Sequence, residues 1–321
     1  MDIIKNDTHI DFMARRKVAL VFSAILMVAS IASLGVRGLN FGLDFTGGTL
    51  IEFGFPEAPD LGDIRSGLGE AGYENYTVQN FGTARDIVVR LPAEVAAEEG
   101  ADISTAAIEA MSRIDAGVDV RRVEFVGPQI GAELANQGGL AMLYALVGIL
   151  LYVSFRFQWR FAVGSVAALM HDVLIVLGLL SLFQVSFDLT VVAALLATIG
   201  YSLNDTIVVY DRLRENFRTK RKGSAVDLTN LSINQMLSRT VMTSMTTLLV
   251  LIALFYFGGE IIHAFAYTLI MGVIVGTYSS IFIASNAAIV LGVSRQDLMP
   301  VEKEGADQPD TEVLPARFRN S

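Results

Sequence analysis

The sequence predicts a polytopic α-helical membrane protein with six transmembrane helices and one α+β domain outside the membrane. Three observations predict it. Of the 321 residues, 53% are hydrophobic, a fraction that soluble domains rarely reach. Six windows are long enough to span a bilayer, because roughly 20 apolar residues cover its hydrocarbon core. The stretch 37–137, between the first two windows, is polar and long enough for one small domain.

The six apolar windows divide the chain into segments. They lie at 18–36, 138–155, 161–183, 189–211, 240–258 and 264–291. We therefore expect an N-terminal segment 1–17, a first helix 18–36, an outer domain 37–137, five further helices within 138–291 that include a surface segment 212–239, and a tail 292–321. Pro and acidic residues in that tail predict disorder.

The basic residues fall on one side of this six-span topology. The 37–137 stretch holds seven Arg against seventeen acidic residues, and the other seventeen basic residues fall at 1–17, 156–160, 212–239 and 295–319. Because positively charged loops stay in the cytoplasm, we expect both termini inside and 37–137 outside. Arg15-Arg16-Lys17 could also open a signal peptide, but the apolar run that follows is long and lacks a small-x-small cleavage site.

The outer stretch has the element order of a ferredoxin-like domain. Alternating apolar residues predict strands at 49–55, 76–81, 86–91 and 118–126, and helical patterns lie at 60–71 and 101–115. Asp102 or Ser104 is the expected N-cap of the second helix. This order is βαββαβ, the split arrangement of ferredoxin-like folds. Further on, Gly131, Gly138 and Gly139 are expected flexible points at the entry to the second span.

Asp205 is the candidate site residue that the sequence singles out, because it lies inside an apolar run that begins at about Leu189. A carboxylate there costs about 2.5–3.5 kcal/mol on insertion scales, and such groups usually mark ion or proton pathways. Desolvation opposes the charged form, which suits a group that takes up and releases a proton. Asn204 and Thr206 flank Asp205 and can hydrogen-bond either protonation state. The alternative is a buried Asp that only holds helices together.

Several other kinds of site are absent from the sequence. There is no Cys, and the three histidines have no metal-ligand spacing. Neither a phosphate-binding loop with its Lys nor a G-x-S-x-G elbow occurs. We therefore expect no cofactor, no metal, no enzymatic activity and no nucleic acid partner.

Four blocks of sequence resemble the SecF family of bacterial protein-export subunits, which belongs with SecD to the RND superfamily. The match extends from about 15 to 295, and its fourth block, which contains Asp205, is highly specific. The blocks are Gly42-Leu43-Asp44-Phe45-Thr46-Gly47-Gly48, Val126-Gly127-Pro128-Gln129-Ile130-Gly131, a third from Phe155-Arg156-Phe157 through His171-Asp172 to Ser181-Leu182-Phe183, and a fourth from Phe187-Asp188-Leu189-Thr190 to Asp211-Arg212-Leu213-Arg214-Glu215-Asn216.

The resemblance implies an RND-type half-transporter in the bacterial inner membrane, with 37–137 in the periplasm and both termini cytoplasmic. It implies partnership with a SecD-like six-span subunit, with the SecYEG translocon and with exported unfolded polypeptides. It implies use of the proton motive force to promote late steps of export. In that family pattern, Asp205 is the proton-relay carboxylate, and Arg239 matches an essential arginine at the start of the fifth span.

Other polar residues in the spans have alternative interpretations. Arg239 can reach inward to pair with a charged Asp205, or it can serve only as a positive anchor at the membrane edge. Asp172 can join the relay or form a hydrogen bond between helices. It adjoins His171, and neighbouring helix positions point about 100° apart, so we expect the two not to face one partner. Asp188 is expected to cap the fourth span.

Two other functions compete with proton-coupled export. One is a non-transporting assembly factor of the translocon, in which Asp205 serves only for packing. The other is an intramembrane aspartyl protease with Asp172 and Asp205 as its dyad, although its usual Tyr-Asp and Gly-x-Gly-Asp motifs are absent. The last span carries small residues that permit either sliding or static helix contacts: Gly272, Gly276, Ser280 and Ala284.

Overall fold

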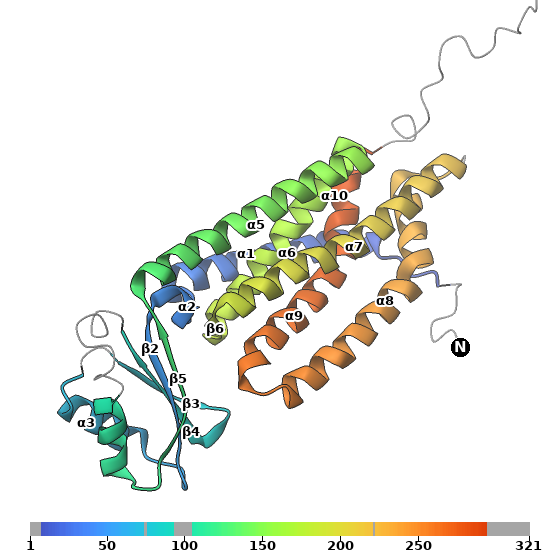
Figure 1. The fold of residues 1–321 in the computed structure, drawn as a ribbon. Coiled ribbons are helices and arrows are strands. Elements are labelled where there is room, and N and C mark those ends of the chain that lie inside the picture. Colours follow the sequence, from blue (N-terminus) through green and yellow to red (C-terminus); the bar gives the residue numbers. More distant parts are fainter. Residues whose placement is uncertain (1–7, 74–75, 93–104, 221, 294–321) are drawn as a thin grey trace, which may run out of the picture.

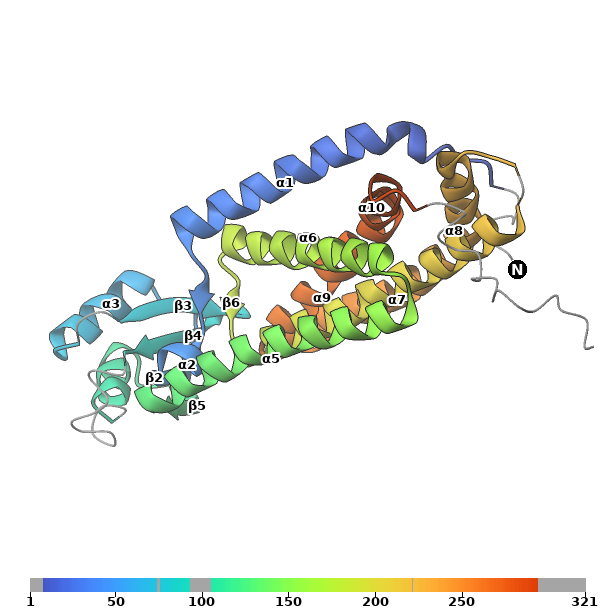
Figure 2. The same ribbon diagram turned by 90° about the horizontal axis from the view of Figure 1, so that it is seen from above.

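The computed structural model describes residues 8–73, 76–92, 105–220 and 222–293. Within them, six helices are long and apolar enough to cross a membrane, and a small sheet domain lies at one end of the bundle that they form (Figures 1 and 2). The predicted fold class is therefore confirmed. The parts of the segments 1–17 and 292–321 that lie at 1–7 and 294–321 are outside the described residues, as are the expected caps Asp102 and Ser104.

The long helices have well-defined bounds, and capping side chains mark the starts of two of them. The helices are α1 (Arg16–Arg37), α5 (Pro128–Arg156), α6 (Trp159–Phe183), α7 (Leu189–Thr219), α8 (Ala225–Phe257) and α9 (Glu260–Ser279). The side chain of Asp188 accepts the Val191 N–H at 2.9 Å and caps α7, as expected. Ser224 and Asp227 form a capping box at the start of α8. A short 3-10 turn, η1 (Met13–Arg15), precedes α1.

Two sequence expectations about helix boundaries are wrong. The helix α5 begins at Pro128, ten residues before the predicted window, and Gly131, Gly138 and Gly139 do not interrupt it. Pro is pre-organised for the first helical turn, and a Cβ on Gly131 would lie 3.1 Å from the backbone nitrogen of Gly47, so this glycine permits close packing rather than motion. The surface segment expected at 212–239 does not form a separate element: residues 212–219 continue α7, and residues 225–239 form one helix with the fifth span, α8, which is visibly bent (Figure 1).

The sheet domain contains four antiparallel strands in the order β3-β4-β2-β5. The strands are β2 (Gly48–Gly54), β3 (Thr77–Phe81), β4 (Thr83–Leu91) and β5 (Asp119–Val126). Helix α3 (Leu61–Glu70) and the helical residues 105–114 cover one face, where Ile51, Phe53, Ile87 and Val89 are fully buried. The ferredoxin-like classification of this domain stays a prediction.

A compact joint connects the sheet domain to the bundle. After α1, strand β1 (Asn40–Phe41) pairs in parallel with β6 (Ser186–Phe187), which lies between α6 and α7. The short helix α2 (Leu43–Thr46) follows, and Asp44 Oδ2 accepts the N–H of Leu189 at 2.9 Å. The rings of Phe41, Phe45 and Phe187 pack together. The outer domain is thus fastened to the first residue of α7.

Arg90 adds an electrostatic contact at the same joint. Its guanidinium donates to Ser186 Oγ at 3.0 Å. Burial lowers the pKa of Arg90, and the nearby Asp188 carboxylate acts in the opposite direction. A strand of the sheet domain and the first turn of α7 therefore carry opposite charges that face each other.

Helices α7 and α9 pack in parallel with a constant register. A Cβ on Gly272 would collide with Thr198, and one on Gly276 would lie 2.9 Å from Ser202 Cβ. Tyr210 Oη donates to the Ala284 carbonyl at 2.8 Å. The small residues of the last span therefore let the two backbones approach closely, as in other membrane helix pairs.

Candidate functional site

Asp205 lies inside the helix bundle, on the side of α7 that packs against its neighbours. It is 4% exposed, and its Oδ2 is buried without a hydrogen-bond partner among the described residues. An unpaired buried carboxylate oxygen is costly in a medium of low dielectric. The structure thus buries the predicted residue with one carboxylate oxygen unsatisfied.

The register of α7 and α9 identifies what lies level with Asp205. The contacts Thr198–Gly272, Ser202–Gly276 and Tyr210–Ala284 share one offset along the two helices, and the same offset places Asp205 level with Ser279. The Ser279 hydroxyl is also buried and without a hydrogen-bond partner within the described part of the chain. Two unsatisfied polar groups therefore lie at one level of the bundle.

The antiparallel helix α8 brings Arg239 to that level. Tyr201 Oη donates to Ser244 Oγ at 3.3 Å, and Ser244 in turn bonds Thr277 at 2.7 Å. One turn from this contact, α7 carries Asp205 and α8 carries Thr240, which directly follows Arg239. The structure records no direct ion pair between Arg239 and Asp205 among the residues it describes. Arg239 itself is exposed at the surface of the bundle.

A second polar cluster lies one turn from Asp205. Asp172, 1% exposed, accepts the Ser202 hydroxyl at 2.5 Å. Its other oxygen lies 2.9 Å from His171 Nδ1. Ser202 precedes Asp205 by three residues, so the two share one face of α7. Asp172 therefore belongs to the same polar interior as Asp205.

His171 and Asp172 face different partners on the neighbouring helices, as expected: Asp172 bonds Ser202 of α7, and His171 stacks on Tyr278 of α9. Adjacent side chains leave a helix about 100° apart, but the imidazole turns back far enough to contact its neighbour. The Tyr278 hydroxyl in turn donates to the Ala19 carbonyl at 2.7 Å. Polar contacts thus extend from α1 to α7 through residues of α6 and α9.

Thr206 and Asn204 differ in their positions. Thr206 is 1% exposed, whereas Asn204 lies on the exposed surface of α7. The structure therefore brings Thr206, but not Asn204, into the buried neighbourhood of Asp205.

The helix that faces Asp205 changes its hydrogen-bond pattern at this level. Directly after Ser279, the π-helical segment η2 (Ser280–Ala284) interrupts the regular helix before α10 (Ser285–Val290). Such π segments occur mostly as single turns inside α-helices, frequently at functional sites. Nothing in the sequence singles out η2, Ser202, Ser279 or Tyr278, since serine and tyrosine are ordinary residues in membrane helices.

The described residues hold no group of three or more His, Cys, Asp or Glu side chains that could bind a metal ion. The ionisable side chains that the structure gathers near this level are Asp205, Asp172, His171 and Arg239.

Comparisons with known proteins identify the family. The profile described as "Protein export membrane protein SecD/SecF, C-terminal" matches residues 106–294, and the "SecD/SecF GG Motif" matches residues 32–55. "Protein translocase subunit SecF" of Vibrio alginolyticus is 53% identical over 95% of this chain and 98% of its own length. The subunit of the same description from Pseudomonas aeruginosa is 53% identical over 91% and 94%. The chain belongs to the SecF family.

A solved structure supports the same assignment. SecDF from Thermus, described as a translocon-associated membrane protein, superposes with a TM-score of 0.81 at 36% identity. The superposition covers 90% of this chain but 39% of the SecDF chain, so this chain spans less than half of that protein. By family and by its six apolar helices, the chain is a multi-pass protein of the bacterial inner membrane and a component of protein export.

Proposed function

We propose that this chain uses the proton motive force to promote late steps of protein export, as one half of a complex with a SecD-like six-span subunit beside the SecYEG translocon. The observation that supports the proposal best is the buried, unpartnered Oδ2 of Asp205. A buried carboxylate with an unpartnered oxygen is suited to binding and releasing a proton. Its ionised form only accepts hydrogen bonds and its protonated form also donates one, so the two forms need different contacts from their neighbours.

In this mechanism Asp205 and Arg239 act as a charge-dependent contact. Ionised Asp205 attracts the Arg239 guanidinium, which α8 carries at the same level of the bundle. Protonation removes that attraction and changes the preferred packing of α7 against α8. One charge that crosses the full membrane gains about 2.3 kcal/mol per 100 mV, which biases a two-state packing by roughly fiftyfold.

Asp172 and Thr206 are proposed supporting residues, and Asn204 contacts the surroundings of the bundle instead. Asp172 reaches the face of α7 that carries Asp205 through Ser202. It can therefore pass a proton, or adjust the position of α7, one turn away from the relay carboxylate.

The proposed orientation places both termini and the 212–239 segment in the cytoplasm. The distribution of basic residues supports it. The sheet domain then lies in the periplasm, where an exported unfolded chain emerges. A SecD-like partner is supported by the solved SecDF chain, of which this chain matches 39%, and by the apolar side chains that α1 and α5 leave exposed.

The test is export into inverted vesicles, with and without a proton uncoupler. We expect Asp205→Asn and Arg239→Met to leave the complex assembled and the ATP-driven step intact, but to abolish the uncoupler-sensitive component. Asp211→Asn is the matched control, since it makes the same change on the same helix at a carboxylate whose side chain is 60% exposed. Full uncoupler-sensitive export by the Asp205→Asn protein would remove this residue from the relay and favour the role of an assembly factor.

A further inference from the structure

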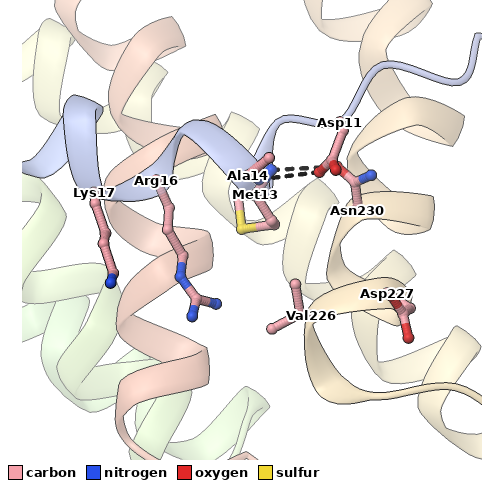
Figure 3. Close-up of a pocket in the computed structure, with 8 residues that line it drawn as sticks. All are labelled: Asp11, Met13, Ala14, Arg16, Lys17, Val226, Asp227 and Asn230. Atoms are coloured by element: carbon pink, nitrogen blue, oxygen red, sulfur yellow. Dashed lines mark hydrogen bonds between the residues drawn. The ribbon is translucent and has the colours of Figure 1, made fainter.

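A cavity of about 390 Å³ lies between the start of α1 and the first turns of α8. The start of α1 and the first turns of α8 lie at the end of the bundle opposite the sheet domain (Figure 1). Arg16 and Lys17 line it from α1, and Val226, Asp227 and Asn230 line it from α8 (Figure 3). The relay residues discussed above are not among those that line it.

The cationic groups of this cavity lack partners. Arg16 Nη1 is buried without a hydrogen-bond partner, and neither Arg16 nor Lys17 forms an ion pair within the described residues. Figure 3 shows both side chains extending from α1 in the same direction, with the Arg16 guanidinium facing Val226. Five N–H donors of a guanidinium and three of an ammonium are therefore available to a ligand that accepts hydrogen bonds.

Each acidic or amide side chain that lines the same cavity accepts hydrogen bonds from nearby backbone or hydroxyl groups. Asn230 Oδ1 accepts the N–H groups of Phe12 and Met13 at 2.8 and 3.4 Å. Asp227 Oδ2 accepts from the backbone and hydroxyl of Ser224 at 2.9 and 2.7 Å. Asp11 Oδ1 accepts the Ala14 N–H at 3.0 Å. Asp11 and Asp227 balance the two cationic charges of the lining, but both bond within their own segments and lie apart from the Arg16 guanidinium (Figure 3). The side of the cavity next to α1 therefore offers cationic hydrogen-bond donors, which a phosphate matches with several oxygens.

The surface next to the cavity favours a lipid over a free phosphate ion. Beginning with the residue after Lys17, α1 exposes a series of large apolar side chains to its surroundings. Their exposed fractions are 71% for Val18, 61% for Val21, 52% for Phe22 and 61% for Ile25. Acyl chains lying along these residues would place a phosphate headgroup beside Arg16 and Lys17. Basic pockets between membrane helices are known places for anionic headgroups.

We propose that this cavity binds the headgroup of an anionic phospholipid, with the lipid phosphate between Arg16 and Lys17 and the acyl chains along the exposed face of α1. The lipid would hold the start of α1 against the first turns of α8. This binding site does not depend on the proton relay.

Native mass spectrometry of the full chain, titrated with phosphatidylglycerol or phosphatidylcholine, tests the proposal. We expect phosphatidylglycerol to bind more tightly, and Arg16→Gln or Lys17→Gln to weaken its binding about fivefold each, because a basic residue at a lipid surface contributes about that factor. Arg15→Gln is the matched control, since Arg15 directly precedes Arg16 but does not line the cavity. It should change binding less than twofold.

Four outcomes would overturn the proposal. Equal binding of the two lipids would show that the headgroup charge is not recognised. Equal losses in Arg15→Gln and Arg16→Gln would indicate diffuse attraction to the membrane surface rather than a site. Displacement of phosphatidylglycerol by an equal concentration of inorganic phosphate would make a free anion the ligand. Loss of the bound lipid when the SecD-like subunit is added would assign the cavity to that partner.

Discussion

In the sheet domain, the side chains buried between the strands and their helices are almost all apolar, whereas those buried around α7 are in large part polar. The sheet core consists of residues such as Ile51, Phe53, Ile87 and Met111. Around α7, Thr198, Ser202, Asp205 and Thr206 are all buried. In water, burial of apolar area stabilises a domain. In lipid, helices associate through close packing and polar contacts instead.

This difference separates residues that maintain the fold from residues that are available for function. The apolar sheet core contains none of the candidate site residues, and the unpartnered polar atoms recorded in the sheet domain belong to charged side chains outside that core, Asp86, Arg90 and Arg122. Inside the bundle, the described residues with unpartnered polar atoms include Asp205, Ser279, Thr198 and His171. Each of these has a cost that the surrounding packing must offset. Buried groups that destabilise the fold in this way are where an activity is to be sought.

The largest expected effect is on the sheet core. Phe53→Ala removes a fully buried ring and should lower the free energy of unfolding of the outer domain by about 3–5 kcal/mol. Denaturant-dependent proteolysis of the full chain in nanodiscs measures this. Val123→Ala, a 46% exposed position on β5, is the control and should change it by less than about 0.5 kcal/mol. If both substitutions lowered the free energy of unfolding equally, the two faces of the sheet would contribute equally to stability.

A smaller effect is expected at the contact between α7 and α9. Gly272→Ala would press a methyl group into Thr198 and should lower the free energy of bundle unfolding by about 1–3 kcal/mol, as overpacking does. Unfolding of the full chain in mixed micelles measures it. Gly148→Ala on α5 has open space at its Cβ, so it should stabilise by roughly 0.5–1 kcal/mol. A Gly272→Ala protein as stable as the control would show that these helices separate easily.

A weaker effect is expected from the hydrogen bond between Ser202 and Asp172. A double-mutant cycle with Ser202→Ala and Asp172→Asn in the same unfolding assay should give a coupling free energy of about 0.6 kcal/mol, and at most about 1.7 kcal/mol. A coupling near zero would mean that the 2.5 Å contact does not contribute to stability.

The smallest effect on stability is expected for Asp205→Asn. The amide keeps the shape of the side chain and removes the charge, so the free energy of unfolding should stay within about 0.5 kcal/mol of the wild type. Together with the export assay described above, this result would separate the function of Asp205 from its packing. A large loss of stability would instead support the packing interpretation.

The sequence predicted the parts of this structure that hydropathy controls. Six spans are visible because lipid requires long apolar helices, and Asp205 is visible because an acidic residue within such a helix is rare. The start of α5 at Pro128 was missed, since residues 128–137 are not apolar enough to be counted with the span. The contacts of Ser202, Ser279 and Tyr278 depend on how helices pack together, which one sequence does not reveal. The π segment η2 has no known signature in its residues.

The joint beside β1 and β6 has a mechanical consequence. Asp44 holds the first N–H group of α7, and Asp205 lies seventeen positions beyond Asp188 on the same rigid helix, or roughly 25 Å at 1.5 Å per residue. A shift or tilt of α7 that begins at Asp205 must therefore either move α2 and the sheet with it or break the Asp44 bond and the Phe41–Phe187 pairing. Movement of α7 along its axis would therefore be transmitted from the level of Asp205 to the outer domain, which is attached at the other end of the helix.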